Sequence, residues 1–198
     1  MKKNLFSIVL LISVLTIQAQ EKDKVKEVGL TFYNLDGFGL TYRLGNENAV
    51  WRFNSLFFGT TDQSGNNSNN NKSIGLGSSL GREWRKAMTD KLDFRYGVDV
   101  FYNYRKNTAD NYLTPELENE NIFNSGGLNL ILGFNYEVSS SILVGIELLP
   151  SFSYTERKDT YYQSASVNSL FTKYENTDYY SSVQLQNNSA LISIVYRY

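Results

Sequence analysis

Apolar and polar side chains alternate with a period of two along most of the chain after residue 27. That repeat is the pattern of a β-strand, in which successive side chains point to opposite faces. The clearest run is 92–104, where a face of apolar and aromatic residues opposes a mostly polar and charged face. The pattern predicts eight strands, over residues 28–33, 38–44, 51–57, 74–81, 92–104, 127–137, 142–154 and 179–198.

The connections between these strands alternate between short turns and long loops, provided that the first one, Asp36-Gly37, is a tight hairpin at the end of the long loops. Gly, Asn, Asp and Ser favour reversals of the chain and predict tight turns at Asp36-Gly37, 45–48, 86–91 and 138–141. Long polar loops are predicted at 61–72, 106–121 and 156–178. The alternation is typical of an up-and-down antiparallel sheet with short turns at one end and long loops at the other.

Two positions interrupt the predicted strands. Pro150 cannot donate a ladder hydrogen bond, so a local bulge or bend is expected within 142–154. The segment 179–198 is one long strand if Asn187-Asn188 forms a bulge, and the strands then number eight. A hairpin turn at Asn187-Asn188 would make nine and leave the last strand on the wrong side. We predict an eight-stranded closed barrel, with ten strands as the alternative.

Composition supports an all-β domain and excludes several classes of function. The chain has 15 Tyr, 12 Phe and 14 Gly but only 2 Pro, which favours strands joined by polar turns over helices. It has no Cys, which excludes disulfides and thiolate metal sites, and no His, the commonest general base and metal ligand. Its net charge of −1 provides no electrostatic attraction for nucleic acid. No cofactor and no nucleic-acid partner are therefore expected.

Residues 1–20 have the pattern of a secretory signal peptide. Lys2 and Lys3 give a basic start, residues 5–17 give an apolar core, and Ala19 is a small residue suited to cleavage. The apolar core is shorter than the ~20 residues that a transmembrane helix needs. We predict a cleaved leader over 1–20 and one barrel domain over 21–198, which begins with a charged segment at 21–27.

Alternation alone does not say which face of the barrel is outside. A soluble, lipocalin-like barrel would put the apolar face inside and could hold an apolar ligand, whereas a membrane barrel reverses the faces. The polar face is rich in Gly and Ser, which suits a crowded lumen. Aromatics gather near both ends of the apolar face, as at membrane interfaces: Tyr42, Trp51, Tyr136 and Tyr198 at one end, and Tyr102, Tyr104 and Tyr154 at the other. We predict a single antiparallel up-and-down transmembrane β-barrel.

Charged residues on the polar face are then predicted to lie in the lumen. The predicted lumen charge network consists of Arg43, Arg52, Asp93, Arg95, Asp99, Glu137, Glu147 and Arg197. Opposite charges are roughly matched, so these groups could pair into a closed plug, because an unpaired buried charge is costly. The alternative is a charge-lined pore. An eight-stranded barrel has an interior just wide enough for its own side chains, which favours the plug.

The sequence argues against catalysis and places any specific recognition on the loops. Barrel enzymes generally depend on a His as base or as partner of the base, and this chain has none, so no enzymatic activity is expected. Any specific contact is expected on the loops, because loops on rigid scaffolds usually carry recognition. The loop aromatics that could form a contact surface for glycan or protein are Tyr161, Tyr162, Phe171, Tyr174, Tyr179 and Tyr180.

The closing segment SALISIVYRY, residues 189–198, resembles the last strand of outer-membrane barrels, with Tyr198 where Phe is more usual. The resemblance implies an insertion signal formed by Ile192, Ile194, Tyr196 and Tyr198. GFGLTYRLG, AVWRFN, DFRYGVDVFYNY, LILGFNYEV and ILVGIELLPSFSY also resemble segments of the small outer-membrane β-barrel proteins of Gram-negative bacteria. That family is defined by its barrel and implies no reaction.

The resemblance implies a location in the outer membrane, reached through the signal peptide. The expected partners are outer-membrane lipid and lipopolysaccharide, together with the barrel-assembly machinery and periplasmic chaperones that serve this class. We predict a structural or adhesive role through the outer loops, with a narrow passive pore for ions or small solutes as the alternative.

Overall fold

The computed structural model describes residues 24–33, 37–58, 63–64, 70–111, 114–164, 171–184 and 190–198, which are almost entirely β-strand. The predicted leader over 1–20 lies outside these residues. Within this part of the chain no helix is long and apolar enough to cross a membrane.

Eight strands close into one antiparallel barrel, as the alternation predicts. The ring follows the order β7-β6-β5-β3-β2-β1-β11-β8 and closes where β8 pairs with β7. Its members are β1 (Val25–Tyr33), β2 (Gly37–Gly45), β3 (Ala49–Phe58), β5 (Asn70–Thr89), β6 (Leu92–Asn111), β7 (Thr114–Ser139), β8 (Ile142–Leu148) and β11 (Ala190–Arg197). The pairing of β1 with β11 joins the first and last strands, with Glu27 opposite Arg197.

Two ring strands are interrupted and continue beyond the barrel. β8 stops at Leu148, and after Leu149 and Pro150 the chain resumes as β9 (Ser151–Ser164), in agreement with the bend expected at the proline. β10 (Phe171–Gln184) precedes β11 in the same way, but the predicted bulge at Asn187-Asn188 lies outside the described residues. Asp36 of the predicted first turn also lies outside them, while Tyr33 pairs with Gly37 across it.

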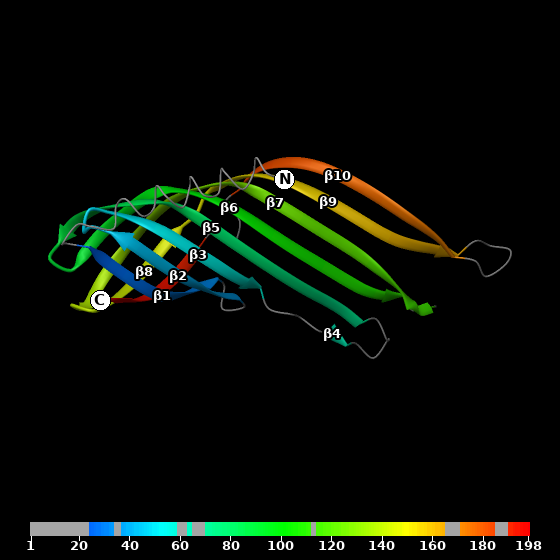
Figure 1. The fold of residues 1–198 in the computed structure, drawn as a ribbon, viewed down its shortest axis with the longest axis horizontal. Helices are drawn as coiled ribbons and strands as arrows, with labels where there is room; N and C mark the ends of the chain where they lie inside the picture. The colour runs from blue at the N-terminus through cyan, green and yellow to red at the C-terminus, as the bar shows by residue number, and fades with distance from the viewer. Residues whose placement is uncertain are drawn as a thin grey trace, which may run out of the picture.

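The barrel carries a long sheet on one side, which we call the extension (Figure 1). It consists of β9, β10 and the ends of β5, β6 and β7 that pair beyond the ring, residues 70–74, 105–111 and 114–129. The short strand β4 (Gln63–Ser64) pairs with the start of β5. The C-terminus lies at the opposite end of the molecule (Figure 1).

The prediction of long loops at 106–121 and 156–178 is wrong for most of those residues. β6 runs to Asn111 and β7 begins at Thr114, while β9 runs to Ser164 and β10 begins at Phe171. Residues 105–109, 156–162 and 172–182 have mostly polar side chains on both faces, so these stretches lack the apolar alternation that marks strands of the barrel. The turn predicted at 86–91 is shorter than expected, because β5 continues to Thr89 and only residues 90 and 91 turn.

The faces of the barrel are arranged as predicted, with apolar side chains outward and charges inward. Val100 on the outer face is 61% exposed, whereas Asp99 beside it in sequence is fully buried. β8 and β11 repeat this alternation residue by residue. Inward glycines make room for the large lumen side chains. A Cβ on Gly145 would lie 2.5 Å from the Ser193 hydroxyl and 3.0 Å from Nη1 of Arg95.

Candidate functional site

A network of charged and polar side chains fills the lumen and draws on every strand of the ring. Inward positions follow the two-residue period, so each strand presents its polar side chains to the same interior space. Four arginines and four carboxylates among the described residues are buried there: Arg43, Arg52, Arg85, Arg95, Glu27, Glu83, Asp99 and Glu147. β7 adds Asn135 and β11 adds Ser193.

Arg52 links strands on opposite sides of the ring. Its Nη1 and Nη2 donate to the two carboxylate oxygens of Glu147 at 2.9 and 2.8 Å, a bidentate pair that joins β3 to β8 across the lumen. Its Nε lies 3.3 Å from Oδ2 of Asp99. The same Asp99 oxygen accepts from the Ser79 hydroxyl at 3.3 Å. The guanidinium of Arg52 therefore links β3 to β8 and to β6.

Glu83 on β5 is the central carboxylate. Arg85 donates to its Oε1 at 2.8 Å, and Arg95 donates to its Oε2 at hydrogen-bond distance. Arg52 donates to Oε2 at 3.3 Å. Arg95 also donates to Glu147 at 2.8 Å and to the amide oxygen of Asn135 at 2.9 Å. Glu83 and Glu147 therefore share two arginines, which ties β5 to β6 and β8.

The end of the network near the short turns is held by Glu27 on β1. Arg85 donates to both of its carboxylate oxygens at 2.7 Å. Arg197 on the last strand lies 3.0 Å from Glu27 and 3.9 Å from Glu137. Arg197 remains partly exposed, so this pair lies where the lumen opens toward the solvent.

Charge balance and apolar layers close the lumen around these pairs. The four buried arginines and four buried carboxylates cancel, which offsets the cost of taking each ion out of water. Along β8 the inward positions run from Leu143 through Gly145 and Glu147 to Leu149, so the charged level lies between two buried leucines. Leu149 packs with Ile131 and Leu191 on the extension side. Charged, polar and apolar side chains thus form a continuous plug.

Among the buried arginines of the lumen network, Arg43 has the weakest contacts with its partners. It is fully buried, but its ion-pair distances to Glu27 and Glu83 are 3.5 and 3.8 Å, and none of its nitrogens makes a hydrogen bond among the described residues. The hydroxyls of Thr31 and Ser193, which face each other on β1 and β11, are also without a partner there. The lumen therefore has several polar groups with unused hydrogen-bonding capacity.

Sequence reasoning placed some members of the network and missed others. Of the predicted charges, Arg43, Arg52, Arg95, Asp99 and Glu147 are fully buried together, and Arg197 and Glu137 pair at the rim. Asp93 faces inward near a turn and makes no ion pair within 4.0 Å among the described residues. None of the described residues forms a cluster of three or more His, Cys, Asp or Glu that could hold a metal ion.

The missed members are Glu27, Glu83 and Arg85. Glu27 falls in the segment predicted as a charged start before the first strand, and the strand predicted to end at Gly81 is too short to include the other two. A usable signal is present in the sequence, because the alternation continues through Glu83, Trp84 and Arg85 with the tryptophan on the apolar face.

A second candidate site is the inner face of the extension. Tyr161 and Tyr174 stack across β9 and β10 with ring centroids 5.4 Å apart, and both remain more than 40% exposed. Tyr161 is an even number of residues from the buried Thr155 on β9, so both side chains point to the same face, and Tyr174 pairs directly opposite Tyr161. The two tyrosines therefore continue the lumen face. Arg157 on this face lies over the ring of Phe123, with its Cζ 5.5 Å from the centroid. Aromatic and charged groups are thus exposed together on one face of the extension.

The other predicted aromatics divide between the two faces of the extension. Tyr180 lies on the inner face, and Tyr179 lies on the outer face, stacked on Tyr154 at 6.0 Å. Tyr162 also has the parity of the outer face, while the side chain of Phe171 lies outside the described set. The residues predicted as one contact surface are therefore not one surface.

The closing strand has its large side chains on the outer face. Ile192, Ile194 and Tyr196 are each about half exposed, and the ring of Tyr196 stacks on that of Tyr198 at 6.2 Å. The alternate positions, Leu191, Ser193 and Val195, are buried in the lumen. The residues of the predicted insertion signal thus form one continuous apolar stripe.

Comparison with known proteins identifies the fold. No protein-family model and no curated protein sequence matches the chain. Among solved structures, a major outer membrane protein from Thermus thermophilus matches with a TM-score of 0.52 and 12% sequence identity. The match covers 88% of this chain and 98% of that protein. At this identity the likeness establishes a shared barrel architecture over nearly the whole chain.

Arg52 and Arg43 offer a matched test of the network. They lie opposite each other on β3 and β2, are equally buried and carry the same charge, but only Arg52 makes close hydrogen bonds. Arg52→Met should therefore lower the free energy of unfolding by about 1–3 kcal/mol more than Arg43→Met, because a hydrogen bond to a charged group contributes about that amount. Urea unfolding of the refolded protein in detergent measures both. Equal losses would show that charge count alone matters.

Proposed function

We propose that the protein is an integral outer-membrane β-barrel whose lumen is closed and whose surface role is carried by the extension. The observation that carries this proposal is the reversal of the usual faces. Large apolar side chains cover the outside of the ring while four arginines and four carboxylates are buried inside it. In water such an outer surface would be an aggregation hazard, whereas in a bilayer it is the expected lipid contact.

The outward aromatic side chains support the same location. At the end with the short turns, Trp84 stacks on Tyr96 at 5.9 Å, and Tyr42, Tyr136 and Tyr196 are exposed nearby in the register. Tyr102 and Tyr154 are exposed toward the extension. Two aromatic bands that flank an aliphatic belt are typical of membrane interfaces. Outer-membrane lipid and lipopolysaccharide are therefore the proposed surroundings of the barrel.

The closing strand and the leader support delivery to that membrane. We propose that the stripe of Ile192, Ile194, Tyr196 and Tyr198 is the insertion signal that the barrel-assembly machinery recognises, after periplasmic chaperones have escorted the chain. The signal peptide predicted over 1–20 would direct export across the inner membrane. The short turns would then face the periplasm, and the extension would stand on the cell surface.

We propose that the role of the extension is adhesive or structural and does not involve catalysis. Its inner face exposes stacked tyrosines beside Arg157 and Phe123, a combination of aromatic faces and charge that suits contact with glycan or protein. A sheet provides a more rigid platform for such contacts than the loops predicted from the sequence. The proposed contact surface is therefore the inner face of β9 and β10.

A narrow passive pore for ions or small solutes is the second candidate. The observation in its favour is the unused hydrogen-bonding capacity of Arg43, Thr31 and Ser193, which water could satisfy inside the barrel. Against it stand the bidentate pairs that cross the lumen and the small bore of an eight-stranded barrel.

Planar-bilayer recordings separate the closed lumen from the pore. The closed lumen predicts no steady ion conductance for the wild-type protein, because charged pairs and leucines fill the interior. A pore would conduct, and Glu147→Lys would shift its ion selectivity, whereas the exposed charge reversal Lys173→Glu on β10 would not. Steady conductance with a selectivity shift specific to Glu147→Lys would contradict the closed lumen.

Two matched pairs of tyrosines test the contact surface. The double variant Tyr161→Ser/Tyr174→Ser removes the stacked pair on the inner face, and Tyr154→Ser/Tyr179→Ser removes the stacked pair on the outer face. Cells that display each protein can be compared for attachment to surfaces coated with polysaccharide or with protein. Attachment should fall only for the inner-face variant. Equal attachment by all three, or equal loss in both variants, would contradict an adhesive inner face.

A further inference from the structure

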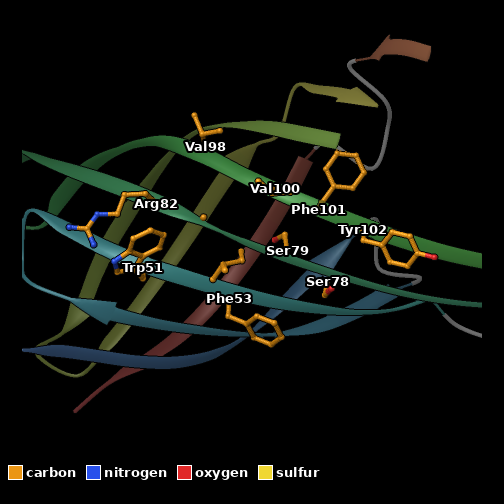
Figure 2. Close-up of a pocket in the computed structure, with 11 residues that line it drawn as sticks. Trp51, Phe53, Ser78, Ser79, Arg82, Val98, Val100, Phe101 and Tyr102 are labelled. Atoms are coloured by element: carbon orange, nitrogen blue, oxygen red, sulfur yellow. The ribbon is translucent and has the colours of Figure 1, made fainter. Parts of the chain in front are cut away.

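The outer face of the barrel has a groove of about 510 Å³ between β3, β5 and β6. Figure 2 shows Trp51 and Arg82 at one end of it, Tyr102 at the other, and Phe53 and Ser78 between them. Ser78 is the small outward residue in the wall of the groove. The outward residues around it, such as Leu80 on the same strand and Phe53 on β3, are large, so they stand higher and leave a hollow between them.

Arg82 is the unusual residue of this groove. It occupies an outward position on β5 between Leu80 and Trp84, where its neighbours along the strand are large apolar or aromatic side chains. Its Cζ lies 5.3 Å from the centroid of the Trp51 ring. No carboxylate among the described residues lies within 4.0 Å of its guanidinium, in contrast to the arginines of the lumen. The N–H donors of Arg82 are therefore available to a ligand.

The position of Arg82 along the barrel sets the depth in the membrane at which that ligand would bind. Arg82 lies among Trp51, Trp84 and Tyr96, in the aromatic band at the end with the short turns. That band marks the level of lipid headgroups. A guanidinium that lies over an aromatic ring keeps its planar set of N–H donors, which matches the geometry of a phosphate.

The groove is long enough for part of an acyl chain. Arg82 and Ser78 are four residues apart on β5, about 13 Å at 3.3 Å per residue. The apolar walls, Phe53, Val98 and Val100, would line this length.

We infer that the groove binds a diacyl phospholipid of the periplasmic leaflet, with its phosphate on Arg82 and an acyl chain along β3, β5 and β6 toward Tyr102. This inference rests on the proposed function, because it needs the outer face to meet lipid. It adds a defined site, a headgroup chemistry and a leaflet. Lipid A also carries phosphate, but it belongs to the opposite leaflet, whose headgroups lie toward the Tyr102 end of the groove and away from Arg82.

Intrinsic fluorescence tests the site, because Trp51 and Trp84 are the only tryptophans of the chain. Trp84→Phe leaves Trp51, in the groove wall, as the single emitter. The protein in detergent micelles is titrated with phosphatidylglycerol or with diacylglycerol, both with brominated acyl chains that quench tryptophan. Phosphatidylglycerol should quench at about tenfold lower mole fraction than diacylglycerol, since a charge-assisted hydrogen bond contributes enough for such a factor.

Variants on the same strand connect the effect to Arg82. Arg82→Gln should abolish the tenfold difference, and Arg82→Lys, which keeps the charge without the planar donors, should retain part of it. Lys86→Gln removes another outward cation four residues away on β5 and should leave the difference unchanged. Ser78→Leu should weaken quenching by both lipids, because a larger side chain fills the groove.

Three results would overturn the inference: equal quenching by the two lipids, an Arg82→Gln variant that behaves as the wild type, or competition by lipid A as strong as that by unlabelled phosphatidylglycerol. Insertion of the same proteins into vesicles, scored by heat-modifiable gel mobility, keeps the two proposals apart. A barrel that inserts without Arg82-dependent quenching refutes only the lipid site. A protein that does not insert refutes the membrane location.

Discussion

The pairing of buried charges inside the ring is the constraint on which the rest of the structure depends. Each of the four buried carboxylates lies within ion-pair distance of at least one arginine, and the links cross from β1 to β11 and from β3 to β8. Removing one partner of such a pair typically costs about 3–5 kcal/mol, because the other charge stays buried. The network therefore holds strands from opposite sides of the ring, such as β3 and β8, in one relative position.

Because charged side chains fill the lumen, the apolar side chains of the ring must lie on its outer surface. An eight-stranded ring has only one interior, and arginine and glutamate side chains occupy it together with a few leucines. The apolar residues on the alternate positions then have no protein core to enter and remain exposed around the ring. A lipid environment resolves this exposure. The parts of the extension farthest from the ring, such as residues 156–162 and 172–182, have mostly polar side chains on both faces.

The alternation of side chains was sufficient to predict the barrel but not its extension. Segments such as 92–104 and 142–154 have one apolar face, so their period is visible in the sequence, and the eight strands of the ring follow from them. Residues 156–164 and 171–178 are strands with polar residues on both faces, and tyrosine, threonine and asparagine in such a stretch suggest a loop equally well. Their β-structure comes from pairing with β7 and with each other.

The sequence predicted that paired charges would fill the lumen, but it did not predict all of the residues involved. Parity put Arg43, Arg52, Arg95, Asp99 and Glu147 on one face, and the aromatic ends of the opposite face placed that face in the lumen. Glu27, Glu83 and Arg85 were missed because the predicted strands ended too early, at positions where charged residues resemble the start of a turn. The individual partners were beyond reach, because a link such as that between Arg52 and Glu147, 95 residues apart, depends on how the ring closes.

The most direct measurement is lipid quenching of a small fluorophore attached to single cysteines along β6, which the absence of native Cys permits. Val98→Cys and Val100→Cys place the label on the outer face, and Phe101→Cys places it on the inner face. In vesicles of brominated phospholipid, the labels at 98 and 100 should be quenched strongly and the label at 101 weakly. Equal quenching at all three positions, or none at 98 and 100, would contradict a barrel with its apolar face in lipid and its charges enclosed.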